Sequence, residues 1–382
     1  MRFHVVGLPN TQTSKKYSAC AFTMKALNFC HMMTSLGHTV YHYGCAGSEA
    51  ECVENVVVMS KAEQEGFFGP YNPNNLPSIE WTDKAPYWRL MNTRVAAAIK
   101  ARKRRGDFVC VITGNMNVPL AEMVGDDVMV VEYGIGYSGS FAKYRVFESY
   151  THMHKIYGAE KGYDPDGNLY DAVIPNYLDP LAFPLQVQKS DYYLYIGRLA
   201  IRKGIQVAVE TCKQIGAKLV LAGPGCQRVE GNKIYCTDGG VYEGDNLKYV
   251  GCVLNDQKAK LYGNAIATFV PTLYLEPFGA VVIESHMTGT PTITTDFGAF
   301  TENVNHGKTG FRCRTLEQFI WAAKHVKDLD PQGIRDYTIA NYSMDRVRWM
   351  YQEYFEMLGN LWEKGWNTLN PGRKNLDWLQ KY

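Results

Sequence analysis

Residues 276–284 read EPFGAVVIE, and SHMTGTPTITTDFGAFTENV follows directly after them. Two carboxylates, Glu276 and Glu284, stand eight positions apart, which is a little over two turns of a helix at about 3.6 residues per turn. A helix that begins near Ala280 places Glu276 in the loop before it and Glu284 about two turns beyond Glu276, on the same side. Each carboxylate can then accept hydrogen bonds from a pair of neighbouring hydroxyl groups.

The Phe278-Gly279 pair between the two acids lets backbone N–H groups approach a ligand closely, because glycine has no side chain. The N-terminal end of the helix carries partial positive charge and therefore favours an anion. A sugar joined to a diphosphate suits such a site. The structural alternative is that Glu276 caps the helix and Glu284 is a solvated helix residue. The joint pattern of the whole segment favours the functional interpretation.

The segment resembles the E-x7-E signature of retaining glycosyltransferases of family 4. Its tail TGTPTITTDFGAFTENV also resembles that family, which has a turn, a strand, Asp, Gly and a helix there. The resemblance is strong over residues 173 to about 345 and weak over the first half of the chain. It implies the GT-B architecture, an α/β fold of two Rossmann-like doubly wound domains that face a cleft.

A second motif supplies positive charge, in the stretch YIGRLAIRKGIQ at residues 195–206. The diphosphate that leaves during sugar transfer gains negative charge, and positioned cations stabilise it best. Arg198 and Lys203 match the G-R-x4-K-G pattern of the family, whose Arg and Lys bind the two phosphates. Arg202 is expected to point to solvent. The alternative is that Arg198 and Lys203 are ordinary exposed cations between a strand and a helix.

The resemblance implies the remaining donor contacts. Glu284 binds the ribose hydroxyls, and Glu276 binds the 3- or 4-hydroxyl of the transferred sugar as a positioning group, not as a nucleophile. Backbone N–H groups of the helix start face the sugar and phosphate, and main-chain atoms of KYVGCVLNDQKAKLYGNA hold the base. The residues implied for these backbone contacts are Phe278, Gly279, Ala280, Gly251, Cys252 and Val253.

The N-terminal half departs from the family in two places. Where many members have a Gly-Gly loop after the first strand, this chain reads LPNTQTSKKYSACAF, with Ser14 among the polar residues that could reach the cleft. Where related enzymes often place a His that bonds the sugar 6-hydroxyl, this chain reads VVEYGIGYSGSFAKYRVFESYTHMH, with Glu132 or Tyr133 in that place. Glu132 is expected beyond a strand end, either bonding the donor or acceptor or standing as an incidental acid in a surface loop.

Apolar runs that resemble strands alternate with helix-like segments along the whole chain, which predicts parallel sheets covered by helices. At 382 residues, two domains are the better expectation. The proline-rich stretch VIPNYLDPLAFPL reads as a connector, so the predicted domains are an N-terminal acceptor-side domain over 1–185 and a donor domain over 186–345. An aromatic-rich helix over about 346–382 is predicted to return to the first domain.

The composition describes a soluble globular protein, with 46% hydrophobic and 20% charged residues. The net charge of +2 gives no general attraction to nucleic acid, so no nucleic-acid partner is expected. The N-terminal sequence reads as a buried strand, and no long apolar run is present, so a cytoplasmic or peripheral location is expected. Ten cysteines at scattered positions are expected to be reduced thiols.

The only dense basic run, KARKRRGD, starts at Lys100 and reaches Arg105 at the end of a predicted helix. A solvated helix end is the default interpretation, since cations complement the helix dipole there; weak peripheral contact with anionic lipid is the alternative. Asp164-Pro165-Asp166 copies the D-x-D of metal-dependent glycosyltransferases but reads as a turn. With Arg198 and Lys203 available to neutralise phosphate, no metal and no further cofactor is expected.

Together with these motifs, the family resemblance implies a retaining, metal-independent glycosyltransferase. Its donor is a nucleoside diphosphate sugar linked to GDP or UDP, with GDP-mannose ahead of UDP-glucose, and its acceptor is a glycan or another hydroxyl compound. A Rossmann oxidoreductase is disfavoured, because no G-x-G-x-x-G follows the first predicted strand of either half of the chain. A non-catalytic nucleotide-sugar or glycan-binding protein remains the alternative, suggested by the altered N-terminal loop and the absent His.

Overall fold

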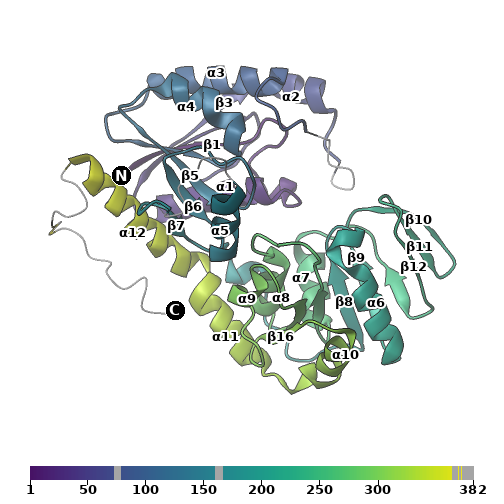
Figure 1. The fold of residues 1–382 in the computed structure, drawn as a ribbon. Helices are drawn as coiled ribbons and strands as arrows, with labels where there is room; N and C mark the ends of the chain where they lie inside the picture. Colours follow the sequence, from purple (N-terminus) through teal and green to yellow (C-terminus); the bar gives the residue numbers. More distant parts are fainter. Residues whose placement is uncertain (73–78, 160–166, 364–368, 370, 372–382) are drawn as a thin grey trace. The chain divides into compact units, whose positions relative to one another are not determined.

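The chain forms two compact units in the computed structural model, which describes residues 1–72, 79–159, 167–363, 369 and 371 (Figure 1). Unit 1 comprises Met1–Pro175 and Met344–Tyr382, and unit 2 comprises Asn176–Ser343. Each unit is built on a parallel sheet flanked by helices. The alternation of strand and helix patterns in the sequence therefore translates into the α/β architecture it predicts.

Unit 1 has a seven-stranded sheet in the order β3-β2-β1-β4-β5-β6-β7, and every neighbouring pair is parallel. The strands are β1 (Arg2–Val6), β2 (Thr39–Cys45), β3 (Glu54–Met59), β4 (Phe108–Val111), β5 (Met129–Ile135), β6 (Tyr144–Phe147) and β7 (Ala172–Val173). The helices are α1 (Ala21–Ser35), α2 (Lys61–Phe68), α3 (Pro86–Lys100), α4 (Val118–Val124), α5 (Tyr150–Ala159) and α12 (Met344–Glu363). The strand order reverses between β1 and β4, as in doubly wound folds.

The last helix, α12, packs on α1 within unit 1. Its Phe355 is fully buried and makes edge-to-face contacts with Phe3 of β1 and Phe108 of β4, at ring-centroid distances of 4.8 Å in both cases. The aromatic residues at helical spacing in this segment thus cover one face of the unit 1 sheet. Trp366 and Trp378, which belong to the same aromatic pattern, lie outside the described residues.

Unit 2 has a six-stranded parallel sheet in the order β13-β9-β8-β14-β15-β16. The strands are β8 (Tyr192–Ile196), β9 (Lys218–Ala222), β13 (Leu247–Tyr249), β14 (Thr268–Val270), β15 (Thr292–Thr295) and β16 (Gly310–Cys313). The helices are α6 (Ile205–Gln214), α7 (Asn255–Asn264), α8 (Ala280–Met287), α9 (Phe300–Asn303), α10 (Leu316–His325) and α11 (Pro331–Tyr342). The order reverses between β8 and β14, so unit 2 is doubly wound as well.

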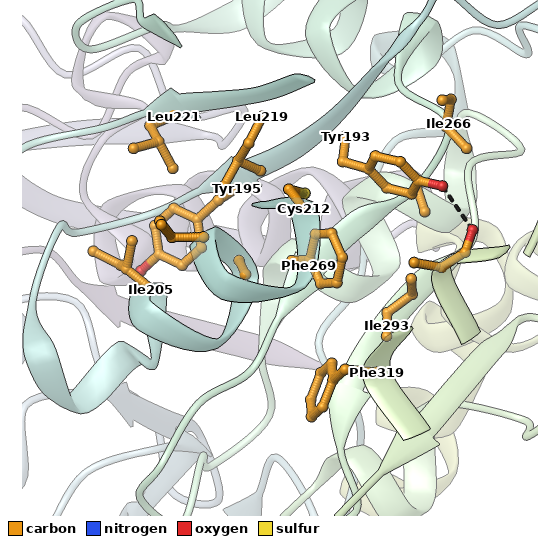
Figure 2. Close-up of a cluster of buried hydrophobic side chains, with 14 of the residues drawn as sticks. Tyr193, Tyr195, Ile205, Cys212, Leu219, Leu221, Ile266, Phe269, Ile293 and Phe319 are labelled. Atoms are coloured by element: carbon orange, nitrogen blue, oxygen red, sulfur yellow. Dashed lines mark hydrogen bonds between the residues drawn. The ribbon is translucent and has the colours of Figure 1, made fainter. Parts of the chain in front are cut away.

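Side chains of β8 alternate between two hydrophobic clusters, because successive residues of a strand point to opposite faces. Tyr193 and Tyr195 join the cluster under α6 and α10, drawn in Figure 2, where the Tyr193 hydroxyl donates to the backbone oxygen of Ala323 at 2.6 Å. Leu194 and Ile196 join the cluster on the other face, with residues of α7 and α8. Burial on both faces explains why YYLYI reads as a continuous apolar run.

The connector between the units packs with unit 2 from Asn176 onward, whereas the sequence places the boundary after residue 185. Phe183 is buried in a unit 2 cluster, and the Arg335 guanidinium of α11 donates to the backbone oxygen of Pro180 at 3.1 Å. The proline-rich connector is therefore held against unit 2 by these contacts. A small antiparallel sheet, which sequence analysis did not anticipate, follows β9 and consists of β10 (Cys226–Glu230), β11 (Lys233–Cys236) and β12 (Val241–Glu243).

A buried histidine makes unit 2 sensitive to acid. His286 of α8 is fully buried with Nε2 2.9 Å from the Thr292 hydroxyl, and burial lowers its pKa from 6.5 to about 3. Between these values the unfolded chain binds the proton and the folded chain does not, so stability is full above pH 6.5 and falls as the pH is lowered. We expect wild-type protein to lose about 2 kcal/mol more than His286→Gln between pH 7.5 and pH 5. Urea unfolding at both pH values measures this, with exposed His154→Gln as control; equal losses would contradict it.

Candidate functional site

The residues of the two motifs meet at the carboxyl edge of the unit 2 sheet, where the strand order reverses. Arg198 follows β8 and Glu276 lies in the loop after the neighbouring strand β14. Residues 251–253 follow β13, at the same edge, and Glu284 lies in α8, which the loop after β14 enters. Parallel strands bring their carboxyl ends together, and open α/β sheets bind ligands there.

Lys203 and Glu276 form an ion pair at this edge, with 2.6 Å between Lys203 Nζ and Glu276 Oε2. The Tyr274 hydroxyl donates to the same oxygen at 2.8 Å. The side chains of Lys203 and Glu276 are 26% and 12% exposed, so solvent reaches both of them. In the part of the chain that the structure describes, no residue hydrogen-bonds Glu276 Oε1. That oxygen is available to a ligand hydroxyl.

Tyr274 also contacts two of the three cations of the 195–206 stretch, Arg202 and Lys203. The Arg202 guanidinium carbon and the Lys203 ammonium nitrogen each lie 4.8 Å from the centroid of its ring. Arg202, which sequence analysis expects to point to solvent, is exposed as expected but stacks on this ring. Arg198 is exposed, and among the described residues it has no ion-pair partner. Its charge is therefore available to an anion at the sheet edge.

Gly204 fixes the course of this cationic loop. Its φ is +73°, a left-handed conformation that other residues rarely adopt, and a Cβ atom there would lie 1.9 Å from the backbone oxygen of Pro271. The loop is also held from the side, because Asp238 Oδ2 accepts a hydrogen bond from the Ile201 N–H at 2.6 Å. The glycine of the motif is thus required for packing, which lets Lys203 reach Glu276.

Glu284 is held by two residues of α7. Lys258 Nζ lies 2.5 Å from Glu284 Oε1, and the Tyr262 hydroxyl donates to Oε2 at 2.7 Å. Sequence analysis missed both residues and Tyr274. The spacing of Lys258 and Tyr262 was the available signal, since residues four apart share one face of a helix. No sequence pattern marks Tyr274, whose role depends on the course of the loop.

The backbone groups expected to face the donor lie in segments that follow β13 and β14, at the same edge of the unit 2 sheet. α8 begins at Ala280, directly after Gly279, and the N–H groups of a first helical turn have no partner within the helix. Phe278 is different, because its side chain is buried against Ile283 and Tyr342. Gly251, Cys252 and Val253 are half-buried between β13 and α7. None of these assignments conflicts with the positions of the residues.

Three expectations for unit 1 are wrong. Glu132 lies within β5, fully buried, and its carboxylate accepts hydrogen bonds from the Tyr137 hydroxyl and from the backbone N–H groups of Phe141 and Ala142, at 2.8–3.0 Å. Burial raises the pKa of Glu132, and the two backbone donors oppose that rise. Because every one of these partners comes from the loop after β5, Glu132 anchors that loop. It is neither a ligand group at a strand end nor an incidental surface acid.

Tyr133 and Ser14 are also buried. The Tyr133 ring lies 4.4 Å from that of Phe29, and its backbone oxygen accepts from the Tyr351 hydroxyl at 2.6 Å, so Tyr133 belongs to the core beneath α12. The Ser14 side chain has no exposed surface, although Lys15 and Lys16 beside it are exposed. The hydroxyl of the loop residue Thr13 is likewise bonded inside unit 1, to His42 Nε2 at 2.9 Å.

The glycine-rich segment after Glu132 makes room for a buried ion pair. Lys25 of α1 and Glu148, just after β6, form a hydrogen-bonded salt bridge with side chains 8% and 11% exposed. A Cβ atom on Gly134 would lie 2.5 Å from the Lys25 side chain, and one on Gly136 would lie 2.5 Å from Glu148. His152 of α5 is also buried, with Nε2 3.0 Å from the backbone oxygen of Tyr137.

The basic run at the end of α3 is partly neutralised within unit 1. Arg102 makes a two-pronged contact with Glu54, at 2.9 and 2.7 Å, and Lys103 pairs with Asp127. None of the helices in the described residues is long and apolar enough to cross a bilayer. Asp164 and Asp166 lie outside those residues. Within them, no group of three or more His, Cys, Asp or Glu side chains is placed to hold a metal ion.

Comparison with known proteins supports the interpretation of unit 2. Residues 182–329 match the family described as "Glycosyl transferases group 1". An uncharacterized glycosyltransferase of Methanocaldococcus jannaschii is 30% identical over 167 residues, which cover 42% of this chain and 40% of that protein. The chain thus spans about two fifths of the length of this curated relative.

Two solved structures resemble the fold over most of its length. AviGT4, a glycosyltransferase involved in avilamycin A biosynthesis, has a TM-score of 0.67 at 17% identity, over 94% of this chain and 98% of its own. HepE of Anabaena, in complex with UDP and glucose, has a TM-score of 0.61 at 12% identity, over 93% and 99%. These likenesses and the two doubly wound units confirm the predicted GT-B fold class.

Proposed function

We propose that this protein is a glycosyltransferase that moves a hexose from a nucleoside diphosphate sugar to a hydroxyl acceptor. The observation that carries the proposal is the grouping of Arg198, Lys203, Glu276 and Glu284 at the carboxyl edge of the unit 2 sheet. Two cations suit a diphosphate, and two carboxylates suit the hydroxyls of a sugar and a ribose. The match of residues 182–329 to a glycosyltransferase family supports the same function.

In the proposed mechanism the cations act on the leaving group. As the glycosidic bond lengthens, negative charge grows on the diphosphate, and Arg198 and Lys203 stabilise it more strongly than in the ground state. The guanidinium makes forked contacts, while the ammonium acts as a point charge. We propose that these two groups replace a divalent metal ion in this role.

Glu276 positions the transferred sugar in this proposal. Its Oε1 accepts a hydrogen bond from a sugar hydroxyl while Oε2 stays bonded to Lys203 and Tyr274. We propose retention of configuration by same-face attack, in which the leaving phosphate takes the proton of the acceptor hydroxyl. In this proposal Glu276 positions the sugar and does not act as a nucleophile.

We propose a GDP- or UDP-linked donor, with GDP-mannose ahead of UDP-glucose, and a glycan or another hydroxyl compound as acceptor. Thermal unfolding with GDP-mannose, UDP-glucose and ADP-glucose ranks the donors, because a bound ligand stabilises the folded state by RT ln(1 + [L]/Kd). Release of nucleoside diphosphate in the presence of mono- and oligosaccharides then tests for transfer. Stabilisation without release would favour the alternative, a non-catalytic binder, and stabilisation by none of the donors would reject both.

Replacing Glu276 with alanine tests its role with the sugar. We expect the preference among donor sugars to fall about tenfold, the value of a hydrogen bond to a charged group. Binding of free GDP or UDP should not weaken, because the substitution leaves Lys203 without its competing acid. Titration calorimetry with nucleotide sugars and free nucleotides measures both quantities, and Glu317→Ala, which removes an exposed carboxylate from α10 of the same unit, is the control. Equal losses for nucleotide and nucleotide sugar would refute the assignment.

A further inference from the structure

The contact between α7 and Glu284 is more specific than a simple helix-to-helix salt bridge. Lys258 and Tyr262 stand one turn apart on the same face of α7, and each engages a different oxygen of the Glu284 carboxylate, at 2.5 and 2.7 Å. The rotation of the carboxylate is therefore fixed by two donors on either side. A carboxylate held by one donor alone would keep more freedom.

The three side chains differ in their access to solvent. Tyr262 is fully buried, Glu284 is 12% exposed and Lys258 is 23% exposed. Burial and the nearby carboxylate raise the pKa of Tyr262 well above its usual value, so its hydroxyl keeps its proton and stays a donor. Tyr262 thus holds the Glu284 carboxylate from the protein interior, whereas Lys258 holds it from the side that solvent reaches.

The carboxylate has further capacity for hydrogen bonds. An ionised carboxyl group offers about four lone-pair sites, of which Lys258 and Tyr262 occupy two, one on each oxygen. The other site on each oxygen can accept one hydroxyl proton. Two acceptor sites on neighbouring oxygens match the two hydroxyls of a vicinal cis-diol, and the diol of a nucleotide is the 2′,3′-pair of ribose.

We propose that Lys258 and Tyr262 are positioning residues that orient Glu284 toward the ribose diol, so that this protein selects ribonucleotides over 2′-deoxyribonucleotides. The inference rests on the proposed function, since it requires a nucleotide at the unit 2 edge. The position of α7 is consistent with it, because the helix begins directly after residues 251–254, next to the loop expected to hold the base. In this proposal α7 lies next to the segment that holds the base and also carries the two residues that orient Glu284 toward the ribose.

A purely structural role for the pair makes a different prediction. If the Lys258–Glu284 contact only joins α7 to α8, its loss changes the stability of unit 2 but not the choice between ribose and deoxyribose. The two roles are separated by measuring each variant with two ligands that differ in a single hydroxyl. The effect of the mutation on that difference isolates the coupling between Lys258 and the hydroxyl.

The experiment is titration calorimetry of the full chain with UDP and 2′-deoxy-UDP, repeated with GDP and 2′-deoxy-GDP. Wild-type protein should prefer the ribonucleotide about tenfold, the value of one hydrogen bond to a charged acceptor. Lys258→Met should weaken ribonucleotide binding by about the same factor and weaken deoxyribonucleotide binding less, because that ligand keeps only the 3′-hydroxyl contact with Glu284, so that the preference falls. Lys258→Arg keeps a positive donor at this position and should retain most of the preference for the ribonucleotide. Lys260→Met, on an exposed position of α7, is the control.

Equal losses for both nucleotides in Lys258→Met, or no loss for either, would overturn the inference while leaving the proposed function intact. Tyr262→Phe gives a second test should Lys258→Met fold poorly, because it removes one hydroxyl and keeps the buried ring. It should likewise reduce the preference for the ribonucleotide. Failure of wild-type protein to bind any of the four nucleotides would reject the proposed function itself.

Discussion

Replacing Arg198 or Lys203 with alanine should lower sugar transfer at least about a hundredfold while the protein stays folded, because each removes a positioned charge from the developing diphosphate. Arg198 is exposed and, among the described residues, has no ion-pair partner, so its loss leaves no buried group unsatisfied. Loss of a cation that acts mainly in the transition state lowers kcat more than it raises KM.

Lys203→Ala should be the more damaging of the two substitutions. It removes a cation and also leaves Glu276 without its partner at 2.6 Å, so that an uncompensated carboxylate faces the diphosphate. Adding Glu276→Gln to Lys203→Ala removes that negative charge and should recover part of the nucleotide binding. The recovery would show that the two side chains act as a coupled pair.

The measurement is release of nucleoside diphosphate from the donor that gives the largest thermal shift, at saturating and limiting concentrations. Lys213→Ala removes an exposed cation from α6 in the same unit and should leave the rate unchanged. Circular dichroism and thermal unfolding check that each variant is folded. Wild-type rates in Arg198→Ala or Lys203→Ala would refute the phosphate assignment.

The second large effect concerns stability. Lys25→Met leaves the Glu148 carboxylate almost fully buried without its cation, and breaking a buried ion pair in this way typically destabilises a protein by about 3–5 kcal/mol. Burial lowers the pKa of Lys25, and the neighbouring Glu148 carboxylate opposes that shift. A drop of this size is a large part of the stability of an ordinary domain.

The double variant Lys25→Met/Glu148→Met is the matched control. It removes both charges and fills the same space with flexible apolar side chains, so most of the lost stability should return. Urea unfolding of the wild type, the single variants and the double variant measures the interaction as a double-mutant cycle. If the double variant is as unstable as the sum of the single variants, the ion pair is not what stabilises this region.

Residues of the unit 2 motifs could be placed from the sequence because their positions are local. Arg198 and Glu276 follow predicted strands by a few residues, and parallel strands necessarily bring such positions to one edge. The same reasoning failed for Glu132. The Gly-rich sequence after it indicates a flexible loop, but the carboxylate accepts from backbone groups nine and ten residues later, and those hydrogen bonds fix the loop.

Sequence order also hides partners that come from distant segments. Lys258 and Glu284 are 26 residues apart, and Lys25 and Glu148 are 123 residues apart. No local periodicity links such pairs, because their contact depends on which helix packs beside which strand. The glycines at 134 and 136 are a second example. Side chains at these positions would clash with Lys25 and Glu148, and the sequence does not show this because the two charged residues come from distant segments.

The amino-acid sequence by itself determined the α/β class, the doubly wound character of both halves and the edge at which Arg198, Lys203, Glu276 and Glu284 gather. These features follow from hydrophobic periodicity and from short-range spacing, which depend only on neighbouring residues. The tertiary structure alone decided that Glu132 and Tyr133 are interior and that Lys258, Tyr262 and Tyr274 hold the two acids. Hydrogen bonds and burial of that kind arise between segments far apart in the chain, where the free energy of packing, not local preference, selects the partners.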